Sequence, residues 1–395
     1  MTPAARVAAA IEVLDQILDG MPAEKAMTGW ARRSRFAGSG DRAALRDLVF
    51  DALRRKRSLA ALGGAMTGRG LMLGLLRAEG RASDDVFTGQ GHAPVPLEPA
   101  EQAAGRMPEP GPEASDMPDW LWPHFTGSLG AKAEDVARIL QTRGPVMLRV
   151  NLRKASLATA QSALADEGIA VQPDAIASTA MLVQTGARKL AQTQAYLTGL
   201  VELQDGSSQA VMDELDLPSV GNIMDFCAGG GGKALAMAAR SNARIRAHDL
   251  QASRMKDLPA RAERAGVQIG IVDSGELADH APFDLVLCDA PCSGSGAWRR
   301  APEAKWALNA ERLEELTHIQ DGILDQAATL VAADGCLAYA TCSVLEIENE
   351  ARQAAFLARH PDWQCISARR WDPCASGDGF FLAQFRRRTA DHSEN

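Results

Sequence analysis

A run of four glycines between an apolar stretch and a run of alanines constrains this chain more than any other feature. Ile223 and Met224 lead into Asp225, glycine occupies positions 229–232, and an alanine-rich stretch covers 234–239. This order predicts a buried strand, a tight turn and the start of a helix. Glycine is required where the backbone takes a positive φ or lies close to a ligand, and the first N–H groups of a helix have no partners within it. The stretch therefore predicts a ligand-binding turn in an α/β fold; the alternative is a flexible linker in an ordinary α/β fold.

A second acid favours the ligand-binding interpretation. Asp249 lies at the end of the next apolar stretch, which begins at Ile245. An acid about 20 residues after the glycine loop, at the end of the second strand, is placed to accept hydrogen bonds from ribose hydroxyls.

Length and composition indicate a soluble protein of several domains. A chain of 395 residues is too long for one typical hydrophobic core, and its 46% hydrophobic and 23% charged content is ordinary for a globular protein. No apolar run reaches the length of a membrane span, and the first fifteen residues lack the uninterrupted apolar core of a signal peptide. The seven cysteines all follow Phe226, which is no disulfide framework, so we expect a cytoplasmic protein. The net charge of −8 argues against a protein that simply coats nucleic acid.

Residues 1–78 are predicted to form a helical domain. Val7, Ile11, Leu14 and Leu18 recur at the spacing of one helix face. A second helix is expected to be capped by Asp41 and to share one face among Leu45, Leu48, Val49, Ala52 and Leu53. It ends in the basic run 54–57, which either contacts phosphates or only complements the helix dipole.

Two further segments precede the glycine loop. Residues 79–119 are rich in proline, glycine, alanine and acids, and we interpret them as a linker or poorly ordered loop. Residues 120–203 combine two helices with a β-α-β-β pattern between Met147 and Gln184, which predicts a small α+β module of ferredoxin-like type. Such sheets often face RNA, but these strands lack aromatic residues for base stacking.

Residues 204–388 are predicted to form a parallel, doubly wound sheet, followed by a tail over 389–395. Strands that alternate with helices indicate this fold, in which ligands bind at the carboxyl ends of the strands. The expected strands are Ile223–Cys227, Ile245–Asp249, Val267–Asp273, Phe283–Asp289, Cys336–Ala340, Trp363–Ser367 and Phe380–Phe385.

Acids and cysteines follow several of these strands and should meet at one edge of the sheet. They are Asp225, Cys227, Asp249, Asp273, Asp289, Cys292 and Cys342. Buried structural thiols are the common alternative for any one cysteine. No second Cys/His pair stands at metal-ligand spacing, so we expect no zinc at Cys288, Cys292 and Cys342.

The sequence resembles the RNA (cytosine-5) methyltransferase family, in its bacterial Sun/Fmu (RsmB-like) branch, over about residues 120–388. The motifs that carry the resemblance are Leu203-Gln-Asp-Gly-Ser-Ser-Gln209, Asp225-Phe-Cys-Ala-Gly-Gly-Gly-Gly-Lys233, Asp289-Ala-Pro-Cys-Ser-Gly-Ser-Gly296, Arg299-Arg-Ala-Pro-Glu-Ala-Lys-Trp306, Ala340-Thr-Cys-Ser343 and Asp378-Gly-Phe-Phe381. The first helices also resemble, over a shorter match, the NusB-like N-terminal domain of that branch. The family's loop usually reads Cys-Ala-Ala-Pro-Gly-Gly-Lys-Thr; here Gly229 and Gly230 replace Ala-Pro, and Ala234 replaces Thr.

The resemblance implies a Rossmann-like catalytic domain that binds S-adenosylmethionine. By this resemblance Asp249 takes the ribose hydroxyls, Asp273 lies by the adenine, and Asp289 lies near both the cofactor and the target base. The full set of implied cofactor residues is Cys227, Ala228, Gly229, Gly230, Gly231, Gly232, Lys233, Asp249, Arg254, Asp273 and Asp289.

The resemblance also implies the catalytic residues Cys342, Cys292, Asp289 and Lys233. Carbon 5 of cytosine takes a methyl group only after a thiolate adds to carbon 6, which explains the need for a cysteine. In the family the Thr-Cys-Ser cysteine attacks and the Pro-Cys-Ser cysteine assists release, which assigns Cys342 and Cys292 respectively. The sequence alone leaves the order open, because DNA cytosine methyltransferases attack with a Pro-Cys cysteine.

These observations predict an RNA 5-methylcytosine methyltransferase, with small-subunit rRNA as the expected substrate and an unpaired or flipped cytosine as its target. We expect a monomer that binds neither a metal ion nor a membrane. Arg299, Arg300, Lys305 and the run 386–388 either hold the RNA backbone or form a solvated face. A tRNA methyltransferase, a small-molecule methyltransferase and a non-catalytic RNA-binding or ribosome-assembly protein remain as alternatives.

Overall fold

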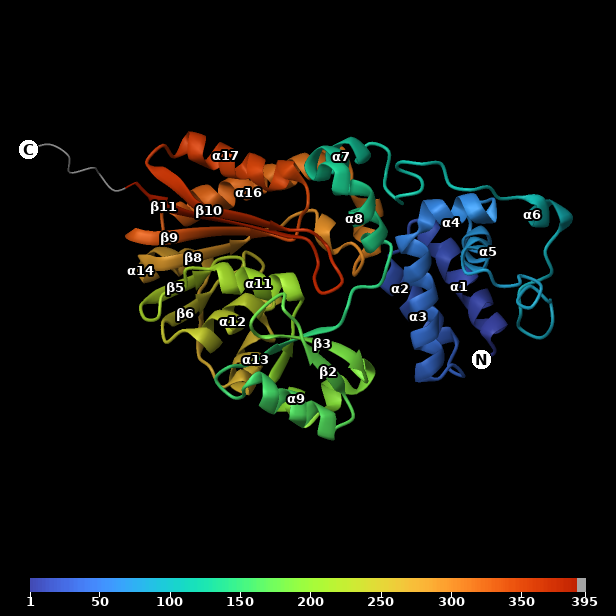
Figure 1. The fold of residues 1–395 in the computed structure, drawn as a ribbon, viewed down its shortest axis with the longest axis horizontal. Coiled ribbons are helices and arrows are strands. Elements are labelled where there is room, and N and C mark those ends of the chain that lie inside the picture. The colour runs from blue at the N-terminus through green and yellow to red at the C-terminus, as the bar shows by residue number, and fades with distance from the viewer. Residues whose placement is uncertain (389–395) are drawn as a thin grey trace, which may run out of the picture. The chain divides into compact units, whose positions relative to one another are not determined.

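The computed structural model describes residues 1–388 (Figure 1). The chain divides into two compact units, residues 1–143 with 298–308 and residues 144–297 with 309–388. The segment 298–308 belongs to the first unit although its neighbours on both sides belong to the second, an excursion that periodicity does not indicate. The tail predicted at 389–395 lies outside the described residues.

The first unit is helical, as the sequence predicts for its N-terminal part. Helix α1 begins after Thr2, whose side chain accepts a hydrogen bond from the Ala5 N–H, and it buries Val7, Val13 and Leu14. At the start of α3 the cap residue is Gly38, and Asp41 accepts from its N–H, so the expected capping by Asp41 itself is corrected by three positions. The helices are α1 Pro3–Leu18, α2 Ala23–Arg33, α3 Ser39–Arg54, α4 Lys56–Gly63, α5 Gly68–Ala78, α6 Pro99–Ala103, α7 Trp122–Leu129, α8 Ala133–Leu140 and α15 Pro302–Ala307.

Residues 79–119 pack on this unit although little of the segment is helical. Val86, Phe87 and Leu97 are buried in the same hydrophobic core as α1, α3 and α5. The carboxylate of Asp116 is fully buried and accepts from the Ser58 hydroxyl and from the N–H groups of Arg57 and Ser58. Three apolar side chains and one buried carboxylate thus hold a segment whose composition indicated a loose loop.

The segment 298–308 is held by buried polar groups. Arg54 donates to the carbonyl oxygen of Arg299 at 2.6 Å, and the Trp306 indole donates to that of Leu53 at 2.7 Å. Burial lowers the pKa of Lys305 to about 8. Arg299 and Lys305 are each only 1% exposed, so the interpretation that they hold RNA phosphates is wrong for both.

The second unit begins with the predicted ferredoxin-like module. Its four-stranded sheet has the order β2-β3-β1-β4 with antiparallel neighbours, and Leu148, Val150 and Leu164 lie in its core. The last strand, of three residues, is too short to give a periodic pattern in the sequence. The elements are β1 Met147–Val150, α9 Leu157–Asp166, β2 Ala170–Pro173, β3 Ala180–Thr185, α10 Gln194–Leu197 and β4 Val201–Leu203.

The larger sheet is Rossmann-like and has the order β10-β11-β9-β8-β5-β6-β7. From β9 to β7 all neighbours are parallel, as predicted, whereas β11 is antiparallel to both β9 and β10. A loop without a helix joins β10 to β11, and such a connection reverses the chain. The strands are β5 Asn222–Asp225, β6 Arg244–Ala247, β7 Ile269–Ile271, β8 Phe283–Asp289, β9 Val331–Thr341, β10 Trp363–Trp371 and β11 Phe380–Arg387.

Helices cover both faces of this sheet (Figure 1). Alternate strand residues enter different cores: Leu285 and Leu287 pack with helices α11 to α13, while Val286 and Cys288 pack with α16 and α17. In a sheet of this kind, ligands bind at the carboxyl ends of the parallel strands. The helices are α11 Gly206–Glu214, α12 Gly232–Arg240, α13 Leu258–Ala265, α14 Leu277–His280, α16 Ala310–Ala328 and α17 Glu350–Arg359.

Within residues 1–388 no single helix is long and apolar enough to cross a membrane. Helices α4 and α5 meet the length and composition criteria only when taken together, with a bend of 87° between them. Side chains of this pair, including Leu59, Leu71 and Leu75, lie in the hydrophobic core of the first unit.

The contacts of Arg54 generate a prediction about the basic run 54–57. Arg54→Ala leaves the Arg299 carbonyl oxygen buried without its donor, so the free energy of unfolding should fall by about 1–3 kcal/mol. Arg55→Ala, on the half-buried neighbour, should stay within about 0.5 kcal/mol of the wild type. Urea unfolding measures both changes. A variant Arg54→Ala with unchanged stability and a flatter salt dependence of RNA binding would return Arg54 to a phosphate-contacting role.

Candidate active site

The glycine loop lies between β5 and α12, and two of its glycines have left-handed backbone. Gly229 has φ +52° and Gly231 has φ +76°, a region that side chains disfavour. A Cβ on Gly231 would also lie 2.2 Å from Cδ1 of Leu258. Gly231 caps α12, so the first N–H groups of that helix follow directly. The loop is therefore shaped by these two positions, and the replacement of the family's proline by Gly230 leaves its turn intact.

Asp249 holds the loop from the next strand end. Its carboxylate accepts from the Gly229 N–H and the Gln251 N–H, both at 2.9 Å, and pairs with Arg254 at 3.1 Å. Oδ1 receives only the Gln251 bond among these and has acceptor capacity left for a hydroxyl. Asp249 and Arg254 thus lie beside the glycine loop, and Asp249 holds the loop in shape, while its contact with the cofactor stays a prediction.

Arg149 of the small module also reaches this loop, which sequence reasoning missed. Its guanidinium donates to the Gly232 carbonyl oxygen at 2.8 Å and to the Gln204 side chain at 2.5 Å. Burial lowers the pKa of Arg149 to about 10. Gln204 belongs to the family motif 203–209, so that motif was a signal, but its partner on β1 carried none.

Lys233 and Asp289 form an ion pair at the centre of the strand ends. Nζ of Lys233 lies 2.5 Å from Oδ2 of Asp289 and 4.8 Å from the ring centre of Phe380. Burial alone lowers the pKa of Lys233, but the charge and hydrogen bond of Asp289 outweigh it, so the net pKa is raised. Lys233 therefore carries its positive charge where the strand ends meet.

Asp225 is a buried acid with unused hydrogen-bonding capacity. Neither carboxyl oxygen has a hydrogen-bond partner of ordinary geometry among the described residues. Burial, and then the charge of Asp289, raise its pKa to about 7, while Lys233 and the Ala234 N–H oppose the rise. A buried carboxyl without hydrogen-bond partners, here at the end of β5, is expected where a polar or cationic ligand binds.

The two strand-end cysteines meet. Their sulfur atoms lie 3.5 Å apart, and the Gly296 N–H donates to the Cys342 carbonyl oxygen at 2.9 Å. The hydrogen bond with Cys342 and then burial raise the pKa of Cys292 well above its ordinary value. Cys292 therefore keeps its proton, and the two thiols share one hydrogen bond whose donor is either sulfur. The charge of Cys342 contributes to the raised pKa of Lys233, so the ammonium acts on this sulfur electrostatically.

The other predicted residues are arranged less directly. Ala228 is buried and its N–H donates to the His248 carbonyl oxygen, while Asp273 is exposed two residues after β7. Burial raises the pKa of the Cys227 and Cys288 thiols, which matches packing rather than reactive sulfur. Through residue 388, no group of three or more His, Cys, Asp or Glu side chains is placed to hold a metal ion.

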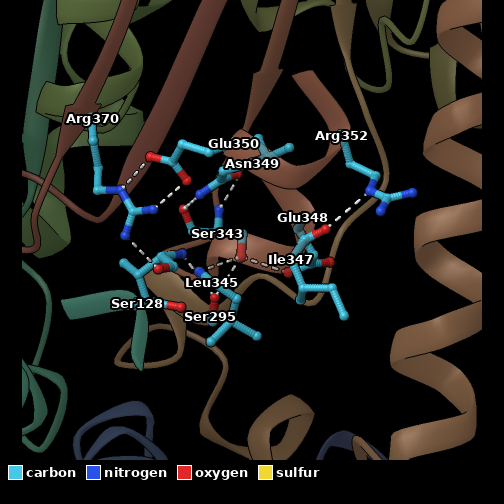
Figure 2. A network of polar contacts seen from close by, with 12 residues as sticks. Ser128, Ser295, Ser343, Leu345, Ile347, Glu348, Asn349, Glu350, Arg352 and Arg370 are labelled. Atoms are coloured by element: carbon cyan, nitrogen blue, oxygen red, sulfur yellow. Dashed lines mark hydrogen bonds and ion pairs between the residues drawn. The ribbon is translucent and has the colours of Figure 1, made fainter. Parts of the chain in front are cut away.

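A polar network behind the cysteines was not foreseen. Glu348 and Asn349, just before α17, hydrogen-bond to the serines that follow the two cysteines and to Thr341. Figure 2 shows Glu348 and Asn349 beside Ser343. Both residues are completely buried. The acidic stretch 346–350 after the Thr-Cys-Ser motif was the available signal, although a run of acids more often indicates a solvated surface.

Comparisons with known proteins identify the family. Residues 213–386 match the family model described as 16S rRNA methyltransferase RsmB/F, and residues 117–188 match its RsmF/B-like ferredoxin-like domain. The chain belongs to the RsmB/F methyltransferase family. The resemblance seen in the sequence is thereby confirmed, and S-adenosylmethionine is confirmed as the cofactor at the level of the family.

Relatives named as rRNA methyltransferases match most of the chain. The Probable ribosomal RNA small subunit methyltransferase B of Bacillus subtilis is 33% identical over 62% of this chain and 57% of its own length. The Ribosomal RNA small subunit methyltransferase B of Xanthomonas campestris is 31% identical over 67% of this chain and 65% of its own length. The chain thus spans somewhat less than two thirds of these curated relatives.

Solved structures share the fold. PH0851 superposes with a TM-score of 0.74 at 22% identity, covering 98% of this chain and 99% of the other. A methyltransferase homolog protein and NSun6 with SFG, both from Pyrococcus horikoshii, give TM-scores of 0.60 and 0.59 at 23% and 17% identity. Both matches cover 69% of this chain. They cover 96% of the methyltransferase homolog protein and 99% of NSun6.

The site of this RsmB/F member suits S-adenosylmethionine. The left-handed glycines give the loop its tight turn, and the carboxyls of Asp225, Asp249 and Asp289 suit a ligand that carries an ammonium and a sulfonium charge. The oxygens of Asp225 without a partner have hydrogen-bonding capacity left for such a ligand. Which of these groups contacts the cofactor stays a prediction.

The backbone of the loop generates a prediction about its glycines. Gly231→Ala forces a side chain into left-handed backbone and against Leu258, so unfolding should become easier by about 2–4 kcal/mol and S-adenosylmethionine binding should weaken. In Gly232→Ala the new Cβ lies 3.8 Å from Gln204 and the backbone is helical, so stability should be retained. Chemical unfolding and titration calorimetry measure both effects. Equal stability of the two variants would contradict the described loop.

The orphan carboxyl generates a prediction about pH. The pKa of Asp225 rises from 3.8 to about 7 on folding, so between these values the folded chain binds more protons than the unfolded chain. Wild-type stability should therefore lose this contribution as the pH rises from 4 to 7, and Asp225→Asn should flatten the loss and be the more stable protein above pH 7. Urea unfolding across this range tests it, with the exposed Asp279→Asn as control. A variant Asp225→Asn with the wild-type pH profile would contradict the buried, ionising carboxyl.

Proposed function

We propose that this protein methylates carbon 5 of a cytosine in RNA through a covalent adduct with Cys342. One observation carries the proposal: the Cys292 and Cys342 sulfurs lie 3.5 Å apart, with Cys342 in electrostatic range of Lys233, which pairs with Asp289. A methyltransferase of nucleophilic small molecules has no need of such a pair, because its acceptor atoms are already nucleophilic.

The chemistry explains the need for a sulfur nucleophile. A bond between the Cys342 sulfur and carbon 6 places an electron pair on the ring and makes carbon 5 nucleophilic. Lys233 supplies the ammonium whose charge acts on the Cys342 sulfur. When bound, S-adenosylmethionine supplies an electrophilic methyl group.

The Lys233–Asp289 pair is suited to the ring nitrogen. Negative charge develops at nitrogen 3 as the sulfur adds, and a proton or hydrogen bond there lowers the barrier. The raised pKa of Lys233 keeps a proton in the pair, so Lys233 supplies it and Asp289 orients the ammonium.

Release returns the ring to aromaticity. A base takes the carbon-5 proton, its electron pair forms the 5,6 double bond, and the bond between carbon 6 and the Cys342 sulfur breaks to give the thiolate. Cys292 lies against that sulfur and its thiol donates to it, which stabilises the departing thiolate. Cys292 is therefore proposed to assist release.

Small-subunit ribosomal RNA is the proposed substrate, because the relatives carry that name. A base inside a duplex cannot contact a half-buried sulfur at a strand end, so the target cytosine is unpaired or flipped out. The same proposal includes a cytoplasmic protein that acts as a monomer without a metal ion.

The two cysteines provide the decisive experiment. Incubated with ribosomal RNA and S-adenosylmethionine, Cys292→Ala should attack but release slowly, giving a denaturant-resistant protein–RNA band. Cys342→Ala should form no band and no 5-methylcytosine, as gel electrophoresis and bisulfite sequencing would show. Transfer RNA serves as the comparison substrate.

The outcomes separate the assignments. Exchanged results would give the attack to Cys292 and retain the enzyme class. Full activity without an adduct in both variants would end the proposal of cysteine catalysis and with it the carbon-5 assignment.

A further inference from the structure

One buried carboxylate joins the two loops that carry the cysteines. Glu348 is completely buried, and its Oε1 accepts from the Ser293 N–H at 2.7 Å and from the Gln320 amide at 3.2 Å. Its Oε2 accepts from the hydroxyls of Ser293 and Ser343, each at 2.5 Å. Ser293 directly follows Cys292 and Ser343 directly follows Cys342, so one side chain holds both loops.

The directions of these hydrogen bonds are determined by the number of protons. Each serine hydroxyl has one proton, and those of Ser293 and Ser343 are donated to Glu348. The Ser343 oxygen then accepts from the Leu345 N–H at 3.0 Å and from the Ser295 hydroxyl at 2.8 Å. The Ser295 oxygen in turn accepts from the Val344 N–H at 2.9 Å. Every donor in this chain is satisfied only if Glu348 accepts at both oxygens.

Neighbouring residues fix Glu348 in turn. The Tyr339 hydroxyl donates to the Glu348 backbone oxygen at 2.6 Å, and the Gln320 amide also donates to the Pro291 oxygen at 2.9 Å. The Asn349 amide donates to the backbone carbonyl oxygen of Ser343 at 2.9 Å and accepts from the Thr341 hydroxyl at 2.5 Å. The residues on both sides of Cys342 and of Cys292 are thereby tied to one rigid network.

The charge of Glu348 also acts on Cys292. After the hydrogen bond with Cys342 and burial, the Coulombic effects of Cys342 and then of Glu348 raise the Cys292 pKa further. The carboxylate thus helps to keep Cys292 protonated beside Cys342.

We propose that Glu348 is a positioning residue that sets the distance and orientation of Cys292 and Cys342 by hydrogen-bonding to the serine after each. It contacts neither reacting atom and acts through the loops. This inference rests on the proposed function, because it assigns Glu348 to the step in which the two sulfurs cooperate.

The substitution Glu348→Gln tests the inference with little change of size. If the amide nitrogen of glutamine faces the serine hydroxyls, both hydroxyl protons lose their acceptor. If the amide nitrogen instead faces the Ser293 N–H and the Gln320 amide, donors face donors and these two hydrogen bonds are lost. Either orientation breaks two bonds, so the loops should shift relative to each other. A misplacement of about 1 Å is expected to lower kcat roughly 100-fold, while KM for RNA should change little.

A readout independent of RNA keeps the inference separate from the proposed function. Diamide oxidises neighbouring thiols to a disulfide, and mass spectrometry of peptides measures the rate at which Cys292 becomes linked to Cys342. This rate should be several times lower in Glu348→Gln than in the wild type. The matched control is Glu350→Gln, which removes a carboxylate of α17 that pairs with Arg370 and lies 43% exposed, and which should retain both the kcat and the disulfide rate.

The outcomes decide between positioning and general stability. S-adenosylmethionine binding and the unfolding midpoint show whether each variant folds. If Glu348→Gln does not fold, Ser293→Ala and Ser343→Ala replace it in the test, because each removes one of the same hydrogen bonds. Wild-type kcat and disulfide rate in a folded Glu348→Gln would overturn the inference. If the wild type makes no 5-methylcytosine, the proposed function fails, and the disulfide rates alone still decide whether Glu348 positions the cysteines.

Discussion

Parallel pairing of β8 with β5 and β9 is the constraint on which the site depends. Asp225 pairs with Leu287, and Asp289 pairs with Ala340, so three neighbouring strands end at almost the same level. The first turn of α12 then places Lys233 against Asp289, and the loops after β8 and β9 place their cysteines in contact. A shift of one residue in either register would turn these side chains to the other face.

Burial gives the charged groups of the site their properties. Water is excluded from Asp225, Lys233 and Glu348, so each depends on its protein neighbours. Lys233 has Asp289 and keeps its charge, Glu348 has four donors, and Asp225 has no such partners and its pKa rises. The hydrogen bond with Cys342, and then burial, raise the pKa of Cys292 and keep it a thiol. The buried charged side chains of the site thus differ in pKa because they differ in their hydrogen-bond and ion-pair partners.

In the helical unit, several basic residues bind backbone and side-chain groups of the protein, whereas their number in the sequence is consistent with phosphate binding. Arg54 and Arg57 donate to backbone carbonyl oxygens, and Lys305 is buried with Asp116 as its main opposing charge. A cluster of arginines in a sequence is consistent with phosphate binding, but the same guanidinium groups are also suited to joining irregular segments that have no helix or strand partner. In this unit they hold residues 79–119 and 298–308.

The sequence by itself determined the order of strands and helices from residue 204, the glycine loop and the acids and cysteines at the strand ends. These features follow from local periodicity and from residue types that permit few alternatives, such as glycine at positive φ. Tertiary structure alone decided that β11 lies antiparallel between β9 and β10, that Arg299 and Lys305 are buried, and that Arg149 reaches the loop. It also decided the role of Glu348, which stands in an acidic stretch that indicates a solvated surface. The reason is physical: hydrogen bonds between residues distant in the chain depend on which elements pack together, and no local pattern records that packing.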